Sequence, residues 1–140
     1  MTADLNKRIQ FCLIVAGIIV VFDAVAGAVS KAFLLDYTKM TLINYVLYLA
    51  AGFLGRKSFD LPTGVSAAFI AGLADATVGW YLSSVIEPFV PFAQPNYSAV
   101  LVFLVIIVIS GAAAFLGYLG ASLYQLLDRS GPPADANNSQ

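Results

Sequence analysis

Two aspartates stand inside long apolar stretches, and their carboxyl groups are the side chains best able to do chemistry. Asp23 lies in the apolar run 9–29, and Asp75 lies in the run 65–86. A charged carboxyl in hydrocarbon costs from about 2.5 to more than 10 kcal/mol, so such a group must be protonated, paired or hydrated. Two carboxyls held close together could share a proton or hold a cation.

Small residues accompany each aspartate on a helix face. At about 100° per residue, Gly27 lies near the Asp23 side of the first segment, and Gly72 and Gly79 lie near the Asp75 side of the third. Membrane helices approach closely where small residues line up, so both carboxyls are expected at a helix interface rather than facing lipid. Close packing is also expected at Gly55 and Gly117. The polar side chains that could support the carboxyls are Asn44, Tyr45, Tyr48, Thr77 and Ser110.

The composition predicts the elements that carry these residues. The chain has 140 residues, of which 60% are hydrophobic and 11% charged, so it is far more apolar than a soluble domain. Four apolar segments, at about 9–30, 38–56, 64–86 and 97–127, come close to or exceed the roughly 20 residues that cross a bilayer as a helix. Barrel strands alternate apolar and polar residues, and these runs do not. We therefore predict an all-α integral membrane protein, a bundle of four transmembrane helices.

Basic residues predict the orientation of this bundle. Lys7, Arg8, Arg56, Lys57 and Arg129 fall on one side of the four segments, whereas Lys31 and Lys39 fall on the other. Cytoplasmic loops carry the excess of basic residues, so both termini are expected to be cytoplasmic in a multi-pass protein of a cell membrane, such as a prokaryotic inner membrane. Residues 1–129 would form the transmembrane domain, and the polar segment 130–140 a disordered cytoplasmic tail.

The first segment also resembles a secretory signal peptide. Lys7 and Arg8 precede an apolar run that leads to the triplet Ala24-Val25-Ala26, which has the small residues of a cleavage site. Against cleavage, Asp23 stands directly before this triplet, and the apolar character continues to Val29. We expect the segment to be retained as a helix.

An internal sequence similarity suggests two tandem helical hairpins. At an offset of 52 residues, Ala16, Asp23, Ala24 and Gly27 recur as Ala68, Asp75, Ala76 and Gly79. The segment 50–55 recurs at 112–117 with an offset of 62, which is ten residues more than the first offset. The proline-containing loop 87–96 is ten residues long and accounts for the difference between the two offsets. Both aspartate helices would then run in the same direction, with the two halves related by a pseudo-twofold axis along the membrane normal. Such an axis could bring Asp23 and Asp75 together at similar depth.

The remaining composition argues against several classes of function. The net charge is -1 and the basic residues are scattered, which excludes a nucleic-acid-binding face. There is no histidine and a single cysteine, Cys12, so no metal site or cofactor is expected.

One resemblance concerns the aspartates themselves. Phe22-Asp23 and Gly72-Leu73-Ala74-Asp75 resemble the Tyr-Asp and Gly-x-Gly-Asp motifs of intramembrane aspartyl proteases, which activate a water between two carboxyls. The chain departs from that family because Phe22 and Ala74 replace the tyrosine and the second glycine, and the family's Pro-Ala-Leu motif is absent. The resemblance implies proteolysis, but these departures lead us to expect a protein that is not an enzyme.

Three functions remain open at this point. The first is a subunit or assembly factor of a membrane complex, or a homo-oligomer, in which the buried aspartates join helices. The second is a small ion- or proton-coupled transporter or channel that uses Asp23 and Asp75 as its binding groups. Intramembrane proteolysis comes third. The expected partners are the lipid bilayer and further membrane subunits or copies of the chain.

Overall fold

The computed structural model describes residues 2–91 and 98–129, and all of the regular structure in these residues is helical. In chain order the elements are α1 (Thr2–Phe33), α2 (Tyr37–Ser58), α3 (Leu61–Ala74), the π-helical turn η1 (Asp75–Gly79), α4 (Trp80–Ile86) and α5 (Ala99–Arg129). Because α3, η1 and α4 follow one another without a break, they form one long helix, and the bundle has four helices as predicted. The predicted tail 130–140 and the loop residues 92–97 lie outside the described residues.

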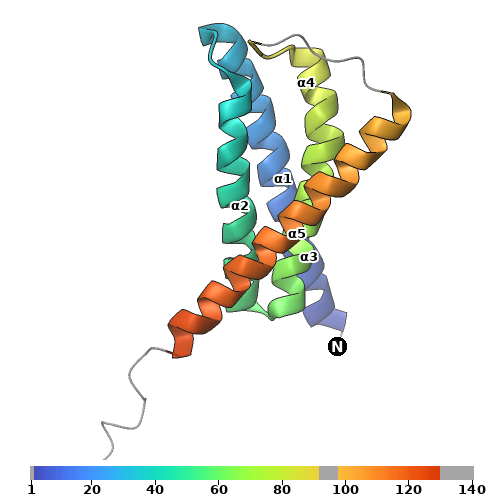
Figure 1. The fold of residues 1–140 in the computed structure, drawn as a ribbon. Coiled ribbons are helices and arrows are strands. Elements are labelled where there is room, and N and C mark those ends of the chain that lie inside the picture. The colour runs from blue at the N-terminus through green and yellow to red at the C-terminus, as the bar shows by residue number, and fades with distance from the viewer. Residues whose placement is uncertain (1, 92–97, 130–140) are drawn as a thin grey trace, which may run out of the picture.

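The four helices alternate in direction (Figure 1). We call the end of the bundle that carries Arg8 and Asp60 the Arg8 end, and the opposite end, which carries Ser30 and Phe89, the Ser30 end. The first helix, α1, runs from the Arg8 end to the Ser30 end. The chain returns along α2, rises again through α3, η1 and α4, and returns along α5 (Figure 1). The two aspartate-bearing helices therefore run in the same direction.

Three of the helices are long and apolar enough to cross a membrane, namely Asp4–Phe33, Leu61–Ile86 and Ala99–Arg129. The shortest predicted segment, 38–56, forms α2, which does not belong to this group of three. The physical reason is its composition, since α2 carries Lys39, Asn44, Arg56 and Lys57 within 22 residues. The expectation of an all-helical chain is confirmed, and crossing of a membrane by α2 stays a prediction.

Alanine and glycine fill the places where the helices touch. Ala67, Ala68, Ala71 and Ala113 are fully buried between α3 and its neighbours. A Cβ at Gly52 on α2 would overlap the backbone oxygen of Gly117 on α5. Helices whose backbones approach this closely gain dispersion contacts over a long line, which is the usual way that apolar helices associate in lipid.

The other predicted close-packing glycines lie at contacts of different tightness. Gly55 packs on the backbone of Gly64, Gly72 packs on Ala113, and Gly79 lies beside both aspartates. Gly27 has more room, because a Cβ there would lie 3.5 Å from the Ile86 side chain.

The last helix, α5, crosses the bundle obliquely (Figure 1). It packs against α2 and α3 and touches η1, but within the described residues its Ser30-end half stands away from α4. This divergence leaves space between α2, α4 and α5.

A polar cluster joins α1 to the turn between α2 and α3 at the Arg8 end. The Asp60 carboxylate caps α3 by accepting hydrogen bonds from Thr63 N at 2.9 Å and from Thr63 Oγ1 at 2.6 Å. The same carboxylate pairs with the Arg8 guanidinium, which also contacts Asp4 at 3.0 Å. The hydrogen bonds from Thr63, together with the Arg8 charge, lower the pKa of Asp60 to about 2.

This low pKa predicts a loss of stability in acid. The ordinary pKa of an aspartate is about 3.9, so the stabilisation by Asp60 is complete above about pH 4 and is lost as the pH falls toward 2. The Asp60→Asn variant keeps a good helix cap but has no carboxyl to protonate. Its melting temperature in detergent should therefore depend less on pH between 4 and 2 than that of the wild type, whereas Asp128→Asn, at an exposed site, should behave like the wild type. An Asp60→Asn melting curve with the full acid dependence would contradict this assignment.

Candidate functional site

One amide joins the two aspartates. Asn44 on α2 donates from its Nδ2 to Asp23 Oδ1 at 2.9 Å and to Asp75 Oδ2 at 3.3 Å. Asp23 comes from the second half of α1, and Asp75 is the first residue of η1. Three helices thus place their polar groups around a single point, and we call Asp23 and Asp75 the aspartate pair.

Tyr48 completes the donors on α2. It follows Asn44 by four residues and therefore lies on the same helix face. Its hydroxyl donates to Asp75 Oδ2, so that oxygen accepts from two side chains of α2. The Tyr48 side chain is 1% exposed, so this contact is protected from solvent.

Two buried oxygens at the pair have no hydrogen-bond partner among the described residues. They are Asp23 Oδ2 and Asn44 Oδ1, on side chains that are 2% and 4% exposed. Leaving such a group without a partner costs about 1–3 kcal/mol, so unpaired buried oxygens are uncommon in folded proteins. The arrangement offers acceptors to a proton, a cation or a donor-bearing ligand, and it offers no free donor at these two atoms.

The π-helical turn shapes the α3–α4 side of the site. The amide of Trp80 bonds to Asp75 O, five residues earlier, where an α-helix would use the residue four earlier. The wider turn keeps residues spaced by four, Asp75, Gly79 and Ser83, closer to one face than an α-helix would. Gly79 then lies against the pair, because a Cβ there would be 2.5 Å from Asp23 Oδ2 and 3.2 Å from Asp75 Oδ1.

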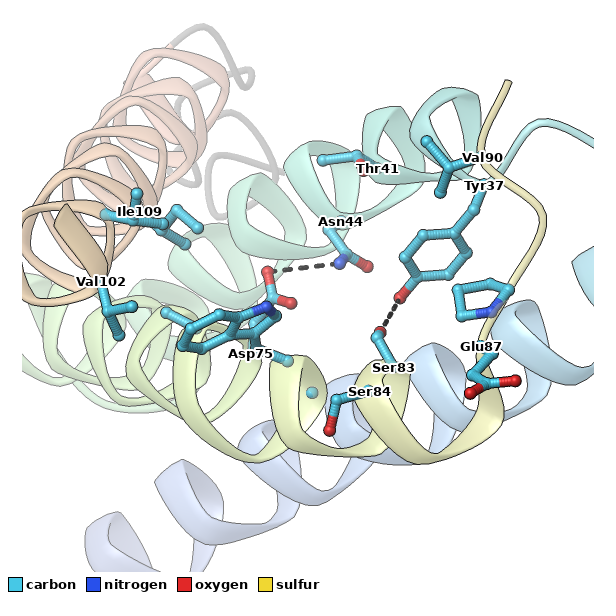
Figure 2. Close-up of a pocket in the computed structure, with 15 residues that line it drawn as sticks. Tyr37, Thr41, Asn44, Asp75, Ser83, Ser84, Glu87, Val90, Val102 and Ile109 are labelled. Atoms are coloured by element: carbon cyan, nitrogen blue, oxygen red, sulfur yellow. Dashed lines mark hydrogen bonds between the residues drawn. The ribbon is translucent and has the colours of Figure 1, made fainter. Parts of the chain in front are cut away.

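A cavity of about 590 Å³ extends from the aspartate pair toward the Ser30 end (Figure 2). Asn44 and Asp75 point into it, and Ile109 of α5 lies across from them (Figure 2). Asp23 is not part of the cavity wall. The cavity wall is formed by Tyr37, Thr41, Asn44, Asp75, Ala76, Gly79, Trp80, Ser83, Ser84, Glu87, Pro88, Val90, Val102, Val105 and Ile109.

Hydrogen bonds fix the wall of the cavity at the Ser30 end. Ser30 Oγ donates to Leu35 O at 2.6 Å and accepts from Phe89 N at 3.0 Å, so α1 holds the segment that follows α4. Tyr37 N donates to Phe89 O at 3.1 Å. Across the cavity, Ser83 Oγ donates to the Tyr37 hydroxyl at 3.2 Å (Figure 2).

Not every predicted supporting residue joins the pair. The Thr77 hydroxyl donates to Leu73 O of its own helix at 2.6 Å, and its side chain is exposed. Tyr45 is 45% exposed on the outside of α2. Ser110 is buried on α5, and its hydroxyl has no hydrogen-bond partner among the described residues. The structure therefore brings Asn44 and Tyr48, but not Thr77, to the carboxyls.

Sequence reasoning missed the cavity residues Tyr37, Ser83 and Glu87. One available signal was the spacing of polar or small residues by four from Asp75, through Gly79 and Ser83 to Glu87. Within the part of the chain that the structure describes, no group of three or more His, Cys, Asp or Glu side chains could hold a metal ion. Comparison with protein-family models, curated proteins and solved structures found no match for this chain.

Proposed function

We propose that this chain is an integral membrane protein whose four helices cross the bilayer, with the Arg8 end on the cytoplasmic side. The three long apolar helices and the excess of basic residues at the Arg8 end support this proposal. The crossing by α2 is supported by the direction of its side chains. Its polar residues Asn44 and Tyr48 are buried, while Leu42 and Val46 are 64% and 66% exposed, so α2 offers lipid an apolar surface.

We further propose that the protein is a small transporter that couples to a proton or a cation through the aspartate pair. The observation that carries this proposal is the position of the Asn44-bridged pair at the inner end of the cavity. Asp75 is the member that an ion can reach, because it lines the cavity and Asp23 does not. Two carboxyls around one amide repel each other when both are charged, which favours capture of a positive charge between them.

The parallel course of α1 and α3–α4 supports the tandem-hairpin hypothesis. Asp23 and Asp75, the equivalent positions of the two proposed copies, meet across Asn44 as a pseudo-twofold axis requires. The copies differ locally, since α1 is α-helical from Thr2 to Phe33 and the second copy contains η1.

Removing the accessible carboxyl tests the transport proposal. In proteoliposomes with an imposed pH gradient or cation gradient, Asp75→Asn should reduce flux to the level of protein-free vesicles, because its amide cannot take up a proton or balance a cation. The matched control is Asp128→Asn, which removes a carboxyl from an exposed site at the end of α5 and should keep wild-type flux. Wild-type flux in folded Asp75→Asn would end this proposal.

Assembly is the second candidate function, and the course of α5 favours it. The half of α5 that stands away from α4 exposes Val100, Phe103 and Val108, which a further membrane subunit or a second copy could cover as well as lipid. If assembly is the function, wild-type vesicles should show no flux, and purification in mild detergent should yield a complex larger than one chain. A single chain without flux would exclude both candidates.

A further inference from the structure

We propose that the cavity above the aspartate pair binds an organic cation, an amine or quaternary ammonium compound with an apolar body. This inference rests on the proposed function, since it names the class of substrate that would reach Asp75. It depends on three independent properties of the cavity, which are its charge, its aromatic wall and its size.

The charged groups of the cavity wall are all acidic. Asp75 lies at the inner end and Glu87 at the Ser30 end, and none of the residues in the wall is a lysine or arginine. Lys31 approaches Glu87 from outside the cavity at 3.8 Å, and both side chains are mostly exposed, so Glu87 is partly compensated. Among the described residues, Asp75 forms no ion pair. An anion would be repelled by the Asp75 carboxylate, whereas a cation would gain a partner that is partly shielded from water.

The rest of the wall suits the body of an organic ligand better than a bare ion. Trp80 and Tyr37 provide aromatic surface, and indole is the side chain that attracts organic cations most strongly. Val90, Val102 and Ile109 add apolar surface on the other sides. A small metal ion would take several oxygen ligands at short range and would gain nothing from these walls. An ammonium group beside Asp75, with its apolar substituents against α5, would use both kinds of surface.

The hydrogen bonds around Asp75 also favour a cationic ligand. Asn44 lines the cavity, and its Nδ2 already donates to Asp23 and Asp75, so it is not free to bind an anion. A carboxylate with no free donor beside it recognises ligand N–H or N⁺ groups. The volume of about 590 Å³ lies within the range of cavities that hold drug-sized molecules.

Tryptophan fluorescence can test this inference without a label, because Trp80 is the only tryptophan of the chain and lines the cavity. We would titrate the purified full-length protein in detergent with benzyltrimethylammonium and with neopentylbenzene, its neutral analogue of nearly the same shape. The cation should change the emission of Trp80 in a saturable way, and the neutral analogue should bind about tenfold more weakly or not at all. Equal binding of the two compounds, or no saturable response to the cation, would overturn the proposal.

Variants locate the site within the cavity. Asp75→Asn should weaken cation binding about tenfold or more, while Asp128→Asn, at an exposed site on α5, should bind it as the wild type does. Unchanged affinity in Asp75→Asn would also overturn the proposal. The comparison of the cation with its neutral analogue needs only the wild type, so it decides the matter even if a variant does not fold.

This binding assay and the flux assay can fail separately. Proton or inorganic cation flux that depends on Asp75, without saturable binding of the organic cation, would remove this inference and leave the proposed function intact. Saturable binding without any flux would support the binding site and contradict transport.

Discussion

The Gly52→Ala variant should be the most destabilised of the glycine substitutions, with a loss of about 1–3 kcal/mol in the free energy of unfolding. A Cβ at this position would overlap the Gly117 oxygen and would lie 2.6 Å from Gly117 Cα. These are backbone atoms, so no side chain can rotate away, and α2 and α5 would have to separate. Separation would also open the adjoining contact in which Gly120 packs on the Leu49 backbone. Unfolding in a denaturing detergent, followed by circular dichroism, would measure the loss.

Matched controls for this substitution exist on α1 and α5. A Cβ at Gly17 or at Gly111 would have no neighbour within 4 Å. In these variants the higher helix propensity of alanine acts alone, so each should be unchanged or more stable by up to about 1 kcal/mol. If Gly52→Ala were as stable as Gly111→Ala, the close approach of α2 and α5 would not exist in solution.

The Gly79→Ala variant should lose most of its flux while it remains folded. The added methyl group would lie between the carboxyls, 2.5 Å from Asp23 Oδ2 and 3.2 Å from Asp75 Oδ1. Both side chains would have to turn away, and the bridge through Asn44 would be lost. Since this bridge places the two carboxyls together, flux in proteoliposomes should fall about tenfold or more, in line with the loss of positioning at a binding site.

The equivalent position in the first proposed hairpin provides the control. Gly27→Ala makes the same chemical change on α1, but its methyl group would meet the Ile86 side chain at 3.5 Å, an ordinary contact distance. This variant should keep near wild-type flux and stability. Equal loss of flux in both variants would show that the effect comes from helix packing in general and not from the aspartate pair.

The sequence was sufficient to predict the helices and part of the site because both depend on local patterns. Hydropathy alone predicts four helices in nearly the observed positions. In the structure α1 continues to Phe33, and α3 begins at Leu61, where Asp60 provides a cap. The aspartates, Asn44 and Tyr48 could be chosen because polar side chains in apolar runs are costly unless they find one another.

Other features could not be predicted because they depend on which helices become neighbours or on which of several possible hydrogen bonds a side chain forms. Thr77 is a polar residue near Asp75 in sequence, yet its hydroxyl bonds to the carbonyl four residues earlier, an alternative that is always available to a helical threonine. The pairing of Arg8 on α1 with Asp60, in the turn between α2 and α3, joins residues far apart in the sequence and has no local pattern. The oblique course of α5, which creates the cavity, follows from the close contacts with α2 and α3 and has no signal in hydropathy.

The π-helical turn at Asp75–Gly79 makes the site depend on helical phase. One residue turns an α-helix by about 100°, and this turn holds one residue more than an α-helical turn, so α4 would be rotated by about that angle relative to α3 if the same residues formed a regular α-helix. Asp75 would keep its contacts with α2, but Trp80 and Ser83 would leave the cavity wall. The cavity is thus specified by the hydrogen-bond spacing of one helical turn as well as by the identities of its residues.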